Sequence, residues 1–487
     1  MKRSLSTGLI AAAGALALKS CSSDRLVVPN YSNPTPESIQ GDPRAAVPYI
    51  VNGVLRTLRG TEPTFVLGTG ILGREAYNYT PTEGRNTSGW LTADVNNPTS
   101  FGATSASLWG DQYTVLRNLD NLRLAVEGAA AGIFSDQEKS AVMGFAHTIE
   151  ALSLLYVISG RHNLGAPVEV QADPNALAPF VSRDSVYNRI IGRLNLARTE
   201  LQAAGTTAFP FAFHSGFSGF TTPANFLKFN RALAARVNAY RAALGVSGCG
   251  SAKQGSVCYQ DALANLGESF LSTTGDLRTG VYNVFSATSG DAANSLSNQA
   301  TANVVAHYQI NAGVQTKANG QPDQRYADKI ITLAQAKPAA NPSIGVPTTF
   351  DFSNNVYATN SSSIPIIRNE ELILLRAEAR YYTGDVVGAV DDINTIRTRS
   401  GGLAPITVAD VPTESAFLDE LLYERKWSLL FEGHRWIDLR RFGRLNSTYV
   451  SIDLPSHIII QQLPVPQAEC LSRSQQTDPA MRGPGCT

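Results

Sequence analysis

The sequence predicts a mainly α-helical protein of stacked helix pairs that carries an irregular, loop-rich region. Apolar residues recur at helical spacing in segments 105–127, 135–159, 182–204, 222–244 and 259–272. Two long stretches, at about 60–104 and 277–363, are instead rich in Gly, Ser, Thr and Asn. We therefore expect a single domain over residues 37–487, with helical repeats at about 105–275 and 364–445 and irregular tracts between them.

The clearest helix pair lies late in the chain. One apolar stripe is formed by Leu372, Leu375, Ala379 and Tyr382, and a second by Val386, Ala389, Val390, Ile393 and Ile396. Between them, Gly384 is placed to end the first helix and Asp385 to cap the second. Two short helices about a tight turn are typical of a tetratricopeptide-like unit of about 34 residues, which must stack on others to bury its stripes.

Composition and the N-terminus indicate an exported protein. The 487 residues carry 40 basic and 40 acidic side chains, so no net charge attracts nucleic acid, and no nucleic-acid partner is expected. A basic start and a short apolar run end at Cys21, as in a bacterial lipobox. Residues 1–20 are thus predicted as a lipoprotein signal peptide, Cys21 as the lipidation site and membrane anchor, and 21–36 as a tether. An ordinary signal peptide with an incidental Cys21 is the alternative.

The other four cysteines form two local pairs. Closure of short loops is the simplest of three connectivities and pairs Cys249 with Cys258 and Cys470 with Cys486. Such bonds fit an exported protein. Neither pair has the spacing of a zinc site, and no metal or cofactor is expected.

Charges and aromatics alternate at residues 424–441, ERKWSLLFEGHRWIDLRR. Charges among buried aromatics must be paired, and partners lie close by, so we interpret the stretch as a structural lock of ion pairs. A catalytic or metal site would need Glu432, His434 and Asp438 to converge. His434 and Asp438 could form one pair of metal ligands, but no third ligand accompanies them in the sequence.

Ligand binding is expected in the irregular tracts, because flat aromatic rings stack on sugar faces and amides or guanidinium groups bind hydroxyls. Trp90 is the strongest candidate, as the largest ring in either tract. The full candidate set is Arg74, Tyr77, Asn78, Tyr79, Asn86 and Trp90 in the first tract, with Arg85 beside them, and Tyr282 and Phe285 in the second. The alternative is that Trp90 and the tyrosines seal a small core beneath the loop.

Three segments resemble the SusD/RagB family of outer-membrane nutrient-binding lipoproteins. They are IPIIRNEELILLRAEARYYTGDVVGAVDDINTIRTRSG, YERKWSLLFEGHRWIDLRRFG and QLPVPQAE, in the family's order and spacing. Ser428, where the family usually has Glu, and the two cysteine pairs are departures. The resemblance implies a tetratricopeptide-like, SusD-like fold, no enzymatic activity, and a place on the outer membrane. It also implies capture of an oligosaccharide or peptide for a SusC-like TonB-dependent transporter, and the region 74–90 corresponds loosely to the family's ligand contacts.

Two other functions remain open from the residues alone. A tetratricopeptide scaffold would bind only protein, and a surface glycoside hydrolase would need two of the 40 acidic residues to act as a pair. No local motif singles out such a pair.

Overall fold

A computed structural model describes residues 41–486, except 101, 103–107, 174–175, 251 and 298–302. The predicted signal peptide, tether and lipidation site at Cys21 lie outside the described residues. Helices of the first half are α3 (Pro43–Leu72), α4 (Arg85–Leu91), α5 (Gly110–Glu127), α6 (Asp136–Arg161), α7 (Arg183–Ala204), α8 (Pro223–Leu244) and α9 (Val257–Gly267). Those of the second half are α10 (Gln324–Lys329), α11 (Asn369–Tyr382), α12 (Val386–Ile396), α13 (Glu414–Ser428), α14 (Arg435–Arg441), α15 (Gln467–Ser472) and α16 (Pro479–Arg482).

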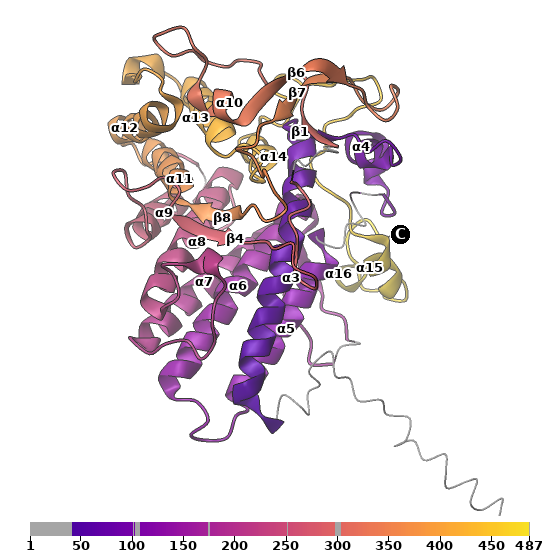
Figure 1. The fold of residues 1–487 in the computed structure, drawn as a ribbon. Helices are drawn as coiled ribbons and strands as arrows, with labels where there is room; N and C mark the ends of the chain where they lie inside the picture. Colours follow the sequence, from indigo (N-terminus) through magenta and orange to yellow (C-terminus); the bar gives the residue numbers. More distant parts are fainter. Residues whose placement is uncertain are drawn as a thin grey trace, which may run out of the picture.

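The helices stack in chain order, as predicted. Successive contacts join α3 to α5 and then run from α5 through α6, α7 and α8 to α9, which packs on α11. Helix α11 then contacts α12 and α13 (Figure 1). The turn between α11 and α12 has the expected chemistry: Gly384 takes a positive φ of 93°, and the Asp385 side chain accepts a hydrogen bond from the amide of Gly388. The mainly α, tetratricopeptide-like fold class is confirmed.

Helix α3 extends to Leu72 and so takes up the beginning of the first tract that the sequence predicted as irregular. It runs through Gly60, Pro63, Gly68 and Gly70 to Leu72. Two of these glycines serve close packing, not a loop: a Cβ on Gly68 would lie 2.6 Å from the Trp90 ring, and one on Gly70 would lie 2.7 Å from the Phe431 ring. The irregular part of this tract therefore begins only after α3.

The strands are short and form two-stranded antiparallel sheets. They are β1 (Ala76–Asn78) with β5 (Val304–Ala306), β2 (Ala166–Pro167) with β3 (Phe180–Val181), β4 (Gly280–Asn283) with β8 (Ile364–Arg368), and β6 (Ile330–Lys337) with β7 (Thr348–Phe352). Figure 1 shows β4 and β8 between the helical part and the end of the molecule that carries α10, β6 and β7. The second predicted tract, 277–363, thus leaves the helical part at β4 and returns at β8.

Two apolar clusters form the core. The larger fills the space among the stacked helices, and the smaller lies beneath the second tract, where Phe285, Phe352 and Tyr357 meet Trp427 and Phe431. The ring of Phe352 stacks on that of Phe431 with centroids 4.6 Å apart. The tract is therefore a packed part of the fold.

Residues 424–441 form the structural lock that the sequence predicted. Arg425 donates to Asp438 at 2.7 Å, Arg441 donates to Asp438 at 2.9 Å, and Arg441 also pairs with Glu378 of α11. All four side chains are buried. Because unpaired buried charges are costly, these contacts fix α13 and α14 against α11.

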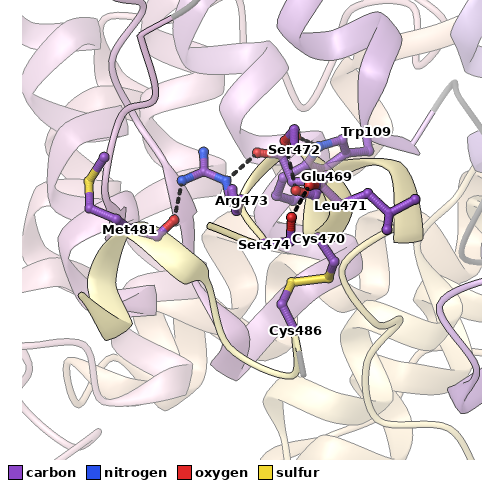
Figure 2. Close-up of a disulfide and its surroundings, with 9 residues drawn as sticks. All are labelled: Trp109, Glu469, Cys470, Leu471, Ser472, Arg473, Ser474, Met481 and Cys486. Atoms are coloured by element: carbon purple, nitrogen blue, oxygen red, sulfur yellow. Dashed lines mark hydrogen bonds and ion pairs between the residues drawn. A yellow bond between two sulfur atoms is a disulfide. The ribbon is translucent and has the colours of Figure 1, made fainter. Parts of the chain in front are cut away.

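Both predicted disulfides are present, Cys249–Cys258 and Cys470–Cys486. Figure 2 shows the second beside Arg473, whose guanidinium donates to Glu469 and to the carbonyl of Met481. The ring of Trp109 donates to the same Glu469. The bond therefore closes a C-terminal lobe that is fastened to the start of α5.

Within the described residues, α6 extended to Leu164 is the one helix long and apolar enough to cross a membrane. Its apolar window is 94% buried in the fold, as in the core helix of a globular domain.

Candidate functional site

A polar cleft lies where the second tract meets the helices. Its volume is about 890 Å³. Its walls come from the segment before and within β4, from α10, from the segment between β7 and β8, and from the start of α11, the turn after α12 and the end of α13. The lining residues are Asp276, Leu277, Arg278, Tyr282, Gln324, Arg325, Asp328, Lys329, Asn354, Asn355, Tyr357, Ala358, Ser362, Ser363, Pro365, Arg368, Glu370, Arg399, Ser400, Ser428 and Glu432.

The last residue of β8, Arg368, organises one wall of the cleft. Its guanidinium is bound by Glu370 and, at 2.9 and 3.0 Å, by the two carboxylate oxygens of Glu432. It also donates to the carbonyl of Ser428 at the end of α13. Burial favours the neutral form of Glu370, but Arg368 and Lys329 outweigh it and lower the pKa of Glu370 to about 2. The Arg368 guanidinium and the Glu370 carboxylate are thus held side by side as a cation and an anion.

Lys329 ends α10 and meets the C-terminal end of α13. Its Nζ donates at 2.7 Å to each of the carbonyls of Trp427 and Ser428. These carbonyls lie in the last turn of the helix, where the helix dipole favours a cation. Burial, partly opposed by Glu432, lowers the pKa of Lys329 to about 8. The amine therefore stays mainly protonated at neutral pH and holds α10 against α13.

Uncharged polar groups and one partly exposed ring form the opposite side. Tyr282 lies on β4 with its ring lining the cleft and its hydroxyl bound to the carbonyl of Arg278. Asn354, Asn355 and Ser363 are exposed on the segment after β7. Tyr357 also lines the cleft, but it is buried, and its hydroxyl donates to the carbonyl of Phe431. Tyr282 is therefore the aromatic face most available to a ligand.

Of the sequence-predicted binding residues, the structure places only Tyr282 in this cleft. Arg74, Tyr77 and Tyr79 do come together, but in a buried cluster around Asp453. The Tyr77 hydroxyl donates to Asp453 at 2.9 Å, its ring stacks on Tyr79, and Arg74 donates to the carbonyls of Ser451 and Ile458. These contacts tie β1 to the segment 451–458.

The remaining predicted residues lie apart from the cleft. Trp90 is 4% exposed and packs on Gly68 of α3 and on Gly102. Phe285 is buried in the smaller core cluster, and the Asn78 side chain accepts hydrogen bonds from Thr80. Asn86 is half-buried on α4. The geometry gives Trp90 the core-sealing role that the sequence left open as the alternative.

Ser451, His307 and Asp453 have the residue types of a hydrolytic triad but not its geometry. Oγ of Ser451 lies 3.4 Å from Nε2 of His307, and that same nitrogen lies 3.1 Å from Oδ2 of Asp453. In a triad the serine and the aspartate bind opposite ring nitrogens. Here Nδ1 faces the amide of Gln309, the side chains of His307 and Asp453 are buried, and Ser451 is half-buried. The cluster is structural.

Among the described residues no three His, Cys, Asp or Glu side chains are placed to hold a metal ion.

Glu75, the neighbour of Arg74, gives a pH-dependent stability. Burial raises its pKa from 4.5 to about 8, although Arg435 and Lys426 oppose the rise. An unfolded chain releases this proton near pH 4.5, whereas the folded chain keeps it up to about pH 8. The contribution of Glu75 to the free energy of unfolding is therefore fully present below pH 4.5 and is lost as the pH rises towards 8.

Glu75→Gln should remove this loss. Relative to the variant, the unchanged protein should lose about 4 kcal/mol of unfolding free energy between about pH 5 and pH 8.5. Urea unfolding of both proteins at the two pH values measures the difference. A constant gap between the two proteins would show that Glu75 is already ionised at low pH.

Sequence reasoning missed most of the cleft, notably Lys329, Arg368 and Glu370. One signal was present: a run of four polar residues, Arg368 to Glu371, directly follows the apolar strand and opens the most regular helix pair. Lys329 and Glu432 have no comparable local pattern.

Comparison with known proteins supports the fold. Residues 345–482 match the model of the SusD family. The chain has a SusD-like fold. Its structure resembles NanU of Bacteroides fragilis, with a TM-score of 0.63 and 13% identity over 92% of this chain and 98% of the other. A SusD homologue of Bacteroides thetaiotaomicron gives a TM-score of 0.63 and 14% identity over 90% and 98%.

A third similar structure is the surface glycan-binding protein A of Bacteroides thetaiotaomicron, solved with laminarihexaose. Its TM-score is 0.60, with 16% identity over 90% of the SusD-like chain and 99% of the other. No curated protein sequence matches the chain. At such identities the structural matches establish the fold, and the family match rests on residues 345–482, which include much of the cleft wall and the structural lock.

Proposed function

We propose that this SusD-like chain is a non-catalytic lipoprotein that binds an oligosaccharide or oligopeptide nutrient in the polar cleft. In this proposal, Cys21 anchors it to the outer membrane, facing the exterior, and it passes the nutrient to a SusC-like TonB-dependent transporter. The observation that carries the proposal is the cleft itself: its volume of about 890 Å³ lies in the range of ligand sites, and fixed polar groups line it.

A carbohydrate is the better supported nutrient. The structurally similar surface glycan-binding protein A was solved with a glucan hexasaccharide, laminarihexaose. In the present chain Tyr282 offers a ring face to a sugar, and Asn354 and Asn355 on the segment after β7 offer amides. Rings and amides are the groups that bind the apolar faces and the hydroxyl edges of sugars.

The state of the acidic residues supports binding without hydrolysis. A glycoside hydrolase needs one carboxyl group of a pair to remain protonated as the general acid. In the cleft, Glu370 and Glu432 share Arg368 as their partner, and the pKa of Glu370 lies near 2. Glu370 is therefore a permanent anion that cannot donate a proton near neutral pH.

Tyr282→Ala should weaken binding of an oligosaccharide ligand by about 1 to 3 kcal/mol, as expected when a stacked ring is lost. Isothermal titration measures the affinity, and product analysis of the same mixtures detects turnover. Tyr49→Ala is the matched control, because Tyr49 is 73% exposed on α3 and lies outside the cleft. Equal effects of the two variants would remove Tyr282 from the site, and turnover by the unchanged protein would make it a hydrolase.

Cys21→Ala should release the full-length protein from the membrane fraction of cells, because the thiol is the only group at this position that can accept the lipid. Fractionation followed by detection of the protein measures the shift. The Cys470→Ser, Cys486→Ser double variant is the control, since it also removes cysteines, those of one disulfide, but leaves Cys21 in place. Continued membrane association of Cys21→Ala would show that lipid on this residue is not the anchor.

A further inference from the structure

The buried charges that line the cleft are bound within the protein. Five basic and four acidic side chains line it. Arg325 is bound by Asp323 and Glu424, and Arg368 by Glu370 and Glu432.

Two other lining cations donate to backbone carbonyls: Lys329 to two of them, and Arg399 to those of Thr273 and Gly275. The exposed charges of the lining are two cations, Arg278 and Arg399, and two anions, Asp276 and Asp328. These four charges sum to zero, and a charged ligand could meet them only in solvent-exposed contacts, which contribute little.

A charged ligand would therefore gain little binding free energy from the charges that line the cleft. A carboxylate on the ligand would have to compete with Glu370 and Glu432 for Arg368, and a ligand ammonium group would have to compete with Arg368 for those same acids. Breaking a buried pair leaves one partner uncompensated, which costs more than a solvent-exposed contact returns. The cleft therefore binds an uncharged ligand in preference to a charged one.

A sugar hydroxyl suits the same groups, because each hydroxyl both donates and accepts a hydrogen bond. Arg368 and Glu432 are bound to each other at 2.9 Å, so a hydroxyl can meet the hydrogen-bonding positions that this pair leaves unused. Asn354, Asn355 and Ser363 add exposed uncharged groups of both kinds. A neutral chain of hydroxyls can use these groups without disturbing an ion pair.

We infer that the cleft selects an uncharged oligosaccharide and rejects acidic glycans and charged peptides. This inference rests on the proposed function, since it names the ligand class of the same site. It also predicts a weak dependence on salt, because only interactions between charges are screened by ions.

The test is binding of the full exported protein to an array that contains neutral glycans, uronic acid glycans and charged peptides. Hits are then measured by titration at about 20 mM and about 300 mM NaCl. We expect neutral glycans among the hits, with affinities that change less than about twofold between the two salt concentrations. Matched acidic glycans should bind at least about tenfold more weakly.

The outcomes separate the two proposals. Preferential binding of acidic glycans or charged peptides, weakened by salt, would overturn the inference while the nutrient-binding function stands. Absence of any binding would overturn the proposed function and the inference with it.

A charge placed in the cleft gives a second test. Ser363 is exposed and lines the cleft, so Ser363→Lys adds one unpaired cation there without removing a buried contact. The variant should bind acidic glycans about tenfold more tightly than the unchanged protein does, and this gain should disappear at high salt. Ser447→Lys, at an exposed serine outside the cleft, is the control. The same gain in both variants would mean that acidic glycans bind elsewhere, and no gain in either would mean that the cleft does not select by charge.

Discussion

Asp438→Ala should destabilise the folded protein by about 3 to 5 kcal/mol. Asp438 is 1% exposed and accepts hydrogen bonds from both Arg425 and Arg441. Burial opposes its ionisation, but the two arginines outweigh burial and lower the pKa of Asp438 to about 2. Its removal leaves two buried guanidinium groups competing for the remaining acceptors. Urea unfolding followed by circular dichroism measures the loss.

The pair Arg198–Glu268 supplies the control for this variant. Glu268 also contacts an arginine, but the two side chains are 41% and 40% exposed, so water replaces the carboxylate at little cost. Glu268→Ala should therefore change stability by less than about 1 kcal/mol. Similar losses in the two variants would mean that the buried lock contributes no more than a surface ion pair.

Trp90→Ala should cost about 3 to 5 kcal/mol of stability, because it opens a cavity between α4 and α3. The ring fills the space above Gly68, which has no side chain of its own to occupy it. Affinity for an oligosaccharide should stay nearly unchanged in the folded fraction, since Trp90 does not line the cleft.

Thermal unfolding and titration on the same Trp90→Ala sample test both halves of this expectation. Trp90→Phe is the graded variant and should lose less stability, because a smaller ring still fills part of the space. Loss of binding with an unchanged melting temperature would return Trp90 to the ligand site that its type and neighbours first predicted.

Local chemistry explains why much of the fold could be predicted. The α11–α12 turn depends on Gly384 and Asp385, which act on groups only a few residues away. Both disulfides close short loops, which was the simplest of the three connectivities that four cysteines allow. Helix α3 was hidden because glycine and proline lower helix propensity, and tertiary packing against Trp90 and Phe431 overrides that preference.

The cleft could not be predicted from the sequence, because contacts between distant segments form it. An aromatic among polar residues has the same pattern whether it is exposed or covered, and what covers Trp90 is a glycine on another helix. Arg368 and Glu432 are 64 residues apart and meet only once α13 packs on the end of β8. Sequence spacing carries no information on such a pair.

The pairing of β4 with β8 fixes both ends of the excursion that lines the polar cleft. Residues 284–363 leave from one strand of a two-stranded ladder and return along the other, so the same hydrogen bonds hold both ends of this excursion. Closing an excursion of twice the length costs only about 0.6 kcal/mol more. A gene could therefore lengthen or shorten the exposed turns of this excursion, provided that the contacts of Phe352 and Tyr357 with Phe431 are kept. The lining of the cleft can then change without refolding the helical repeats.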